Sequence, residues 1–185
     1  MRFSLVDRIL DLQPGKSITT VKCLSLAEEY LADHFPLFPV LPGVLMLEAM
    51  TQSGAWLIRA TEDFAHSIVV LKEARNIKYA DFVEPGQVLT VHAEIAKTTA
   101  RETHLKAQGT VNGKVAVGGR LVLERFNLAE SSAQWMVTDD SIKRTLRRTL
   151  LSLTSQTATR DGGSTEGVHR GLNGGVSSIS ADAAN

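Results

Sequence analysis

The sequence predicts an α+β fold in which an antiparallel sheet wraps around one buried helix. Two observations carry this prediction. The segment from Val44 to Ala60 has the length of a helix and is apolar on every side, which is typical of a helix that is buried all round. Strand-like segments, rich in Val, Ile and Thr and separated by short turns, lie before and after it. Long strands around a single helix favour a sheet packed against that helix.

A hairpin is expected at the start of the fold. Leu5 to Leu12 and Ser17 to Leu26 read as two strands, and Pro14-Gly15 between them supplies the residues of a tight turn. Glu28 and Glu29 then suit a short, exposed helical turn. The chain therefore enters the sheet before it reaches the predicted helix.

The stretch from His34 to Gly43 is predicted to be an irregular loop. It contains three prolines, at positions 36, 39 and 42, and no regular element tolerates prolines at this spacing. Proline is favoured at the first position of a helix. We therefore expect the buried helix to begin at Pro42.

Five further strands are expected after the helix. Glu84-Pro85-Gly86 and Asn112-Gly113 supply turns between them. Together with the first hairpin, these strands complete the predicted sheet. They are Ser67–Leu71, Ile77–Tyr79, Val88–Thr98, Glu102–Val111 and Val115–Phe126.

The composition divides the chain into three parts. Residues 1–127 form the predicted domain, and residues 128–153 form an extension in which Asp139 to Leu153 has the apolar face of an amphipathic helix. That helix either docks on the body of the domain or offers Arg144, Arg147 and Arg148 to an acidic partner. Residues 154–185 hold many glycines and serines and no aromatic residue, so we expect a disordered tail.

The composition also narrows the classes of partner. The 185-residue chain holds 20 basic and 20 acidic residues, so no overall field draws it to nucleic acid or to an anionic membrane. Its longest apolar stretch, Val40 to Ile58, contains Pro42 and Glu48, which favours a buried helix over a membrane span. A single cysteine, Cys23, excludes an internal disulfide, and no secretory signal is evident, so the expected location is the cytoplasm. We expect no metal site and no cofactor.

Glu48 is the first candidate for a catalytic residue. It is the only charged residue between His34 and Arg59, and it falls in the helix that we expect to be buried. Burial of an unpaired carboxylate raises its pKa, which keeps a proton available near neutral pH, as a general acid requires. The alternative is a buried glutamate that hydrogen bonds hold for structural reasons.

The start of the helix supplies further candidates. Side chains on a helix lean toward its N-terminus, so the Glu48 carboxyl is expected to point toward the free N–H groups of Gly43 and Val44. Those N–H groups lie at the positive end of the helix dipole and suit an oxyanion. His34 lies on the loop that leads into this helix end, where it is either a catalytic base or an ordinary surface residue. Together the groups suit removal of a proton next to a carbonyl and protonation of a leaving group, which is elimination chemistry.

These residues carry a resemblance to a known family. The stretch from His34 to Gln52, with its histidine and glutamate fourteen positions apart, resembles the active-site segment of bacterial 3-hydroxyacyl-[acyl-carrier-protein] dehydratases of type II fatty acid synthesis. Leu5–Ile9 resembles the first strand of that family, and Lys78-Tyr79 with Val83–Gly86 resembles a later turn. The resemblance extends from about Phe3 to Phe126.

The resemblance implies a hot-dog fold and a dehydratase. It implies that His34 removes a proton from C2 of a 3-hydroxyacyl thioester, that Glu48 protonates the departing C3 hydroxyl, and that the Gly43 N–H holds the thioester oxygen. The products would be a trans-2-enoyl thioester and water, with the substrate carried on acyl carrier protein or coenzyme A. A glutamate at position 48 matches the subgroup that only dehydrates. The family also implies a homodimer or a trimer of dimers, in which each site combines the histidine of one chain with the glutamate of the other.

Two departures from the family pattern affect the expected tunnel and the carrier contacts. Asp33 and Leu37 stand where the family usually carries glycine, and leucine adds bulk beside the site. Ala80 and Asp81 replace arginines that often grip the acidic carrier protein. The residues expected to line an acyl tunnel are Phe35, Leu37, Phe38, Leu41, Gln52 and Trp56.

Two other functions stay open at this point. One is a hot-dog module without catalytic activity that binds acyl carrier protein or acyl-coenzyme A as a scaffold. A scaffold, however, has no need for His34, Gly43 and Glu48 at catalytic spacing. The other is hydrolysis of an acyl thioester, in which the carboxylate activates water at the carbonyl.

Overall fold

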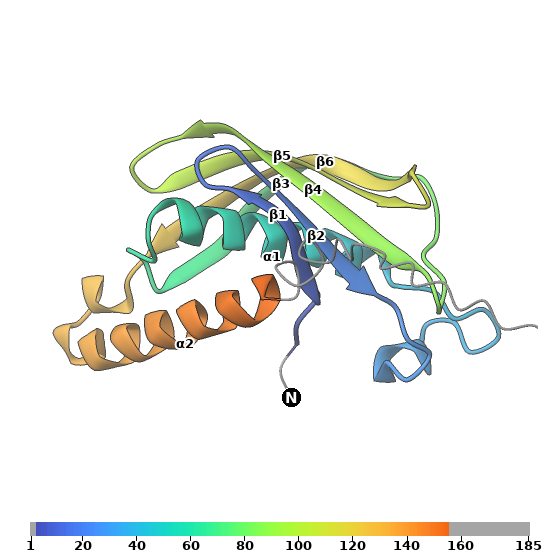
Figure 1. Cartoon of the computed structure of the whole chain (residues 1–185), viewed down its shortest axis with the longest axis horizontal. Helices are drawn as coiled ribbons and strands as arrows, with labels where there is room; N and C mark the ends of the chain where they lie inside the picture. Colours follow the sequence, from blue (N-terminus) through green and yellow to red (C-terminus); the bar gives the residue numbers. More distant parts are fainter. Residues whose placement is uncertain (1–2, 156–185) are drawn as a thin grey trace, which may run out of the picture.

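A single antiparallel sheet with a helix packed on one face forms the body of the protein (Figure 1). The computed structural model describes residues 3–155. The sheet has six strands in the order β1-β2-β4-β5-β6-β3, and α1 (Gly43–Thr61) and α2 (Met136–Thr154) both lie on the same side of it (Figure 1). This arrangement confirms the predicted α+β class. The strands are β1 (Arg8–Gln13), β2 (Ser17–Cys23), β3 (Ile68–Tyr79), β4 (Val88–Thr98), β5 (Glu102–Val111) and β6 (Lys114–Phe126).

The predicted first hairpin is present, but its strands are shorter than expected. The turn between β1 and β2 contains Gly15 in a left-handed conformation (φ 78°), as the Pro14-Gly15 pair indicated. Leu5 and Val6 precede β1 and are nonetheless buried. Burial of apolar side chains gives a strand-like pattern even where the backbone makes no ladder, which explains the early predicted start.

The central helix begins one residue later than predicted, and its first turn is not buried. Pro42 is the N-cap, with extended backbone (φ −52°, ψ 137°), and Gly43 opens the helix. The stretch Ser53–Ile58 is wholly buried, whereas Val44 is 69% exposed. The prediction that the helix is buried on every side is therefore wrong for its N-terminal turn.

The strand β3 replaces two strands that the sequence pattern separated. The residues between the two predicted segments, Lys72–Asn76, are exposed and mostly charged. The pattern of apolar residues that indicates a strand is therefore missing there, although β3 continues to pair with β6. The register shifts between Leu71 and Glu73 and again between Arg75 and Lys78, and Asn76 takes a positive φ of 53°. These bulges bend β3, which forms one edge of the sheet.

The middle of the sheet matches the prediction to within one residue. The β5–β6 turn has positive φ at both Asn112 (50°) and Gly113 (80°), as a two-residue hairpin loop requires. Alternate residues of these strands point toward α1 and form the core with it. The core includes Leu89, Val91, Leu105, Leu121 and Leu123 from the sheet and Met50, Leu57 and Ile58 from α1.

The extension docks on the body through the helix α2. Its Asp139 is buried and accepts hydrogen bonds from Leu128 N–H (3.0 Å), Ala129 N–H (2.9 Å) and the Ser67 hydroxyl. The Arg147 guanidinium donates to the backbone carbonyl of Asp63 (2.7 Å). One of the three arginines that the sequence offered to an acidic partner therefore contacts the body of the domain. Apolar side chains on the same helix pack against the core, namely Leu146, Leu150 and Leu153.

Two further expectations concern the ends and the environment of the chain. The predicted disordered tail, residues 154–185, lies outside the described residues apart from Thr154, which ends α2, and Ser155. Within residues 3–155, neither α1 nor α2 has both the length and the hydropathy to cross a membrane.

Replacing Asp139 with alanine is expected to loosen α2 and to lower the melting temperature by several degrees. Burial acts to raise the pKa of Asp139, but hydrogen bonds from Ser67, Ala129 and Leu128 outweigh it, so the pKa lies below its ordinary value. A lowered pKa stabilises the fold above the pKa of the unfolded aspartate, about 3.9, and this stabilisation is lost as the pH falls through the folded value. The difference in melting temperature between wild type and Asp139→Ala should therefore be full at pH 7 and shrink in acid. Equal melting temperatures at pH 7, with exposed Asp140→Ala as the matched control, would contradict this role.

Candidate active site

Two backbone hydrogen bonds near its end hold the proline-rich loop that leads into α1. The Val40 N–H donates to the carbonyl oxygen of His34 (3.4 Å), and the Leu41 N–H donates to the carbonyl oxygen of Val83 (2.9 Å). Leu41 itself is buried. These contacts fix a loop without regular structure beside the first turn of α1.

His34 lies half-buried on this loop. Its ring centroid is 4.3 Å from that of Phe35. The Nδ1 atom is buried and has no hydrogen-bond partner among residues 3–155, and buried polar atoms are satisfied in most proteins. The imidazole therefore keeps a hydrogen-bonding position that no group within the described residues uses.

The first turn of α1 presents two N–H groups without acceptors. The N–H groups of Leu45 and Met46 both donate to the carbonyl oxygen of Pro42 (2.9 and 3.1 Å). In the described part of the chain, no acceptor takes the N–H of Gly43 or of Val44. The start of a helix leaves such donors free, at the positive end of its dipole. Free N–H groups at this position have the chemistry to hold a developing oxyanion, and that role for Gly43 and Val44 stays a prediction.

Tyr79 lies against Gly43 and was not among the site residues expected from the sequence. A Cβ atom at position 43 would come within 3.1 Å of Tyr79 Cε1, so a larger residue there would press on the tyrosine ring and displace it slightly. The ring is half exposed. Only the resemblance of Lys78-Tyr79 to a family turn pointed to this residue, because its position over the helix end depends on packing between distant segments.

The Glu48 carboxylate lies in the second turn of α1, half-buried rather than fully buried. Gln52 donates from Nε2 to its Oε1 atom (3.0 Å), and the side-chain oxygen of Gln52 accepts the N–H of Leu5 (2.9 Å). The expectation of an unpaired carboxylate is therefore wrong. Gln52, expected to line a tunnel, instead ties Glu48 to the N-terminal segment.

No hydrogen bond or ion pair joins His34 to Glu48 in the described residues 3–155. The Gln52 amide is the hydrogen-bond partner of the Glu48 carboxylate. The described chain thus carries one proposed group on the loop before α1 and the other in the second turn of α1, without a direct contact between them among the hydrogen bonds and ion pairs.

The other residues expected in a tunnel fall into two groups. Leu41 and Trp56 are buried in the core region. Phe35, Leu37 and Phe38 are exposed, and Leu37 is fully so, so these three do not line an enclosed tunnel within the single chain. Their prediction came from their apolar character, which does not distinguish a tunnel wall from an exposed rim.

Exposed apolar side chains gather around the start of α1. The Phe38 and Phe82 rings form an edge-to-face pair with centroids 5.6 Å apart. Grouped apolar exposure of this kind is typical of a surface that another molecule covers. We call the set the apolar rim, and it consists of Phe35, Leu37, Phe38, Val44, Tyr79 and Phe82.

Comparison with known proteins identifies relatives of the chain. Residues 1–125 match the family described as FabA-like domain. The 3-hydroxyacyl-[acyl-carrier-protein] dehydratase FabZ of Ruminiclostridium cellulolyticum is 37% identical over 119 residues, which cover 64% of this chain and 84% of that protein. The enzyme of the same name from Rickettsia rickettsii is 38% identical over 115 residues, covering 62% and 79%.

Among solved structures, a chain of the dehydratase heterocomplex ApeI:P from Xenorhabdus doucetiae has a TM-score of 0.57 and 18% identity, and the match covers 72% of this chain and 90% of that chain. At this identity the likeness concerns the fold alone, and it agrees with the hot-dog architecture that the resemblance implied. The family match, by contrast, spans most of the chain, and the FabZ relatives match over more than two thirds of their own length. The protein therefore belongs to the FabA-like family, together with the FabZ 3-hydroxyacyl-[acyl-carrier-protein] dehydratases.

Proposed function

We propose that the protein is a dehydratase that converts a 3-hydroxyacyl thioester, carried on acyl carrier protein or coenzyme A, into a trans-2-enoyl thioester and water. The FabZ relatives are named as 3-hydroxyacyl-[acyl-carrier-protein] dehydratases, which is this reaction with acyl carrier protein as the carrier. The observation that carries the proposal is the position of Glu48, a held carboxylate one turn beyond two free N–H groups on the same helix.

In the proposed reaction, His34 takes a proton from C2 and the electron pair of that bond forms the C2–C3 double bond. The C3–O bond breaks, and Glu48 gives its proton to the departing hydroxyl, which leaves as water. Negative charge that develops on the thioester oxygen is held by the Gly43 N–H. The proton on His34 then returns to Glu48, so that each cycle releases one water and restores both groups.

Gln52 has a positioning role in this scheme. It donates to Oε1 of Glu48 and is itself held by the Leu5 N–H. With one carboxyl oxygen occupied as an acceptor, Oε2 is left to carry the proton that the departing hydroxyl receives. This contact orients the acid without touching substrate.

We infer that each site combines His34 of one protomer with Glu48 of its partner. Three observations support this arrangement: no hydrogen bond or ion pair joins the two groups within residues 3–155, the Nδ1 atom of His34 lacks a partner there, and the apolar rim is exposed. The edge strand β3, which is twelve residues long, also has an open side, and parts of it between the bulges can pair with a second copy. A homodimer, or a trimer of such dimers, would bury these features.

The proposal is tested by incubating the full chain with 3-hydroxyacyl thioesters on both carriers and following product mass and free thiol. The expected product is an enoyl thioester, lighter by one water, with no release of thiol. The reverse reaction, hydration of the enoyl thioester, should run on the same protein. Release of free thiol would indicate a hydrolase, and tight binding without any change in mass would indicate a scaffold; either result contradicts the proposal.

A further inference from the structure

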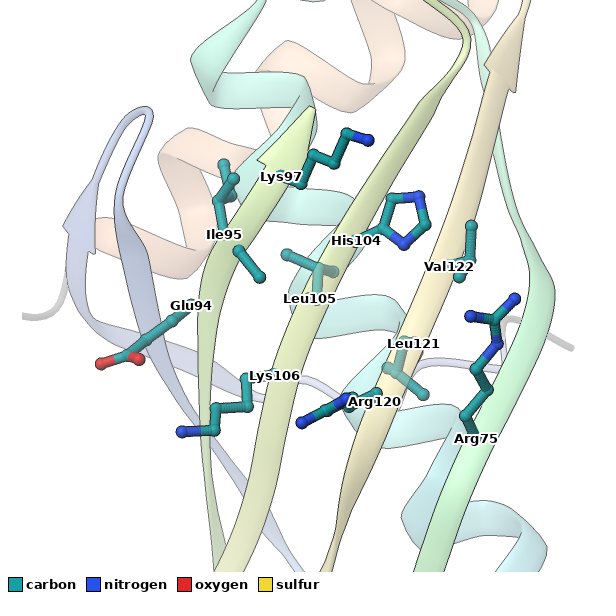
Figure 2. A pocket seen from close by; sticks show the side chains of 11 residues that line it. Arg75, Glu94, Ile95, Lys97, His104, Leu105, Lys106, Arg120, Leu121 and Val122 are labelled. Carbon is teal, nitrogen blue, oxygen red and sulfur yellow. The ribbon is translucent and has the colours of Figure 1, made fainter. Parts of the chain in front are cut away.

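The sheet carries two adjoining hollows on the face turned away from α1. They have volumes of about 500 Å³ and about 480 Å³. Both are lined by Glu94, Lys106 and Arg120, so they meet over the middle of β4, β5 and β6. Figure 2 shows the first hollow, with charged side chains from four strands around it. Neither hollow includes a residue of the candidate active site.

Cations stand opposite one another in the first hollow. Lys106 pairs with Arg120 in the sheet register, and Arg120 pairs with Arg75 on the next strand. Like charges at directly opposed positions destabilise a sheet. Arg75 is neutralised by Glu73 (2.5 Å), but neither Lys106 nor Arg120 has an ion-pair or hydrogen-bond partner in the described part of the chain. An anion bound between them would remove this repulsion.

A third cation without an ion-pair partner and a shortage of acids make the hollow locally positive in the described part of the chain. Lys97 lines it and, within residues 3–155, also has no ion-pair partner. The one carboxylate in its lining, Glu94, already lies 3.3 Å from the Nε2 atom of His92. The chain as a whole has no net charge, so this concentration of positive charge is a local feature of the outer face.

Gly118 lines the second hollow, and the packing around it would also accommodate a residue with a side chain. A Cβ atom at Gly118 would meet nothing closer than 3.7 Å, an ordinary contact. Gly118 pairs with Gln108 on β5, and the side-chain amides of Gln108 and Asn76 line the same hollow. A flat floor with amide groups at its margin suits a planar ring that has hydrogen-bonding edges.

We propose that the two hollows together bind a nucleoside diphosphate group. The phosphates contact Lys106 and Arg120, since a guanidinium fork and an ammonium are the side chains that best recognise phosphate. The base lies over Gly118, between the two amides. Glu94, which borders both hollows, accepts a ribose hydroxyl, the role that acidic residues have in other nucleotide sites. Free nucleotides and coenzyme A both carry this group, and the site is independent of the proposed dehydratase activity.

Calorimetric titration of the full chain with ADP, coenzyme A, adenosine and inorganic phosphate tests the proposal. ADP is expected to bind saturably, at least roughly tenfold more tightly than phosphate or adenosine, because it engages both hollows, and added salt should weaken it. Tighter binding of coenzyme A than of ADP would assign coenzyme A as the natural source of the group, and equal or weaker binding would assign a free nucleotide. If neither binds more tightly than inorganic phosphate, the proposal is overturned.

Variants connect the binding to the two hollows. Arg120→Glu and Lys106→Glu should each weaken ADP binding at least about tenfold by reversing a phosphate contact, and Gly118→Val should do so by filling the floor. Lys114→Glu is the matched control and should leave binding unchanged. It changes an exposed lysine that lies on β6, as Gly118 and Arg120 do, but outside both hollows. Circular dichroism checks that each variant is folded, and dehydratase turnover should stay within about twofold of wild type. Unchanged ADP binding in folded Arg120→Glu and Gly118→Val would rule out this site.

Discussion

The Glu48→Gln variant is expected to lose roughly 10²–10⁴-fold in turnover of a 3-hydroxyacyl thioester, the range that a general acid contributes. Glutamine has the shape of glutamate, and its side-chain oxygen can still accept the hydrogen bond from Gln52 (3.0 Å in the wild type). It holds no proton that it can give to a departing hydroxyl. The measurement is the rate of enoyl thioester formation at saturating substrate, together with the melting temperature of the variant.

The melting temperature separates a chemical effect from a folding effect. Because Glu48 is half-buried and the substitution preserves its volume, the variant should melt close to wild type. Glu84→Gln, at an exposed turn position, is the matched control and should retain full turnover. Near-wild-type turnover in folded Glu48→Gln would remove Glu48 from the mechanism.

The parts of the fold that the sequence predicted are those with strong local signals. Alternating apolar residues located β4, β5 and β6 to within one residue, because the inner face of each strand packs on α1. In β3 the exposed residues Lys72–Asn76 interrupt that alternation. Their backbone stays in the ladder because β6 pairs with it, and a single-sequence pattern does not report such long-range pairing.

In the candidate site, too, the features that the sequence predicted are those with a local sequence signal. His34, Gly43 and Glu48 stood out because prolines, a glycine and an isolated charge mark a short stretch of sequence. Two contacts that shape the site, Gln52 with Leu5 and Tyr79 with Gly43, join segments that lie far apart along the chain. No local pattern specifies them.

Exposure at the start of α1 was also beyond prediction. Apolar residues there suggested burial, yet Val44 is 69% exposed and Leu37 fully exposed in one chain. An apolar side chain is expected to be buried, but its hydrophobicity does not indicate whether the protein's own core or a second copy of the chain buries it. Under the proposed function, the second copy is what covers the apolar rim.

The shared site also makes a quantitative prediction for mixed dimers. If His34 of one protomer works with Glu48 of its partner, a dimer of one His34→Ala chain and one Glu48→Ala chain places both substitutions in one site and leaves the other site intact. Random pairing makes about half of the dimers mixed, each with one intact site of two, so activity should recover to roughly a quarter of wild type.

The decisive measurement is therefore the dehydratase activity of these two variants, each inactive alone, after they are unfolded together and refolded as a mixture. Mass analysis of the intact dimers establishes that mixed dimers are present. Recovery to roughly a quarter of wild-type activity is the result we predict from random pairing. If mixed dimers form and no activity returns, each site takes both groups from one chain, and the shared arrangement of His34 and Glu48 is contradicted.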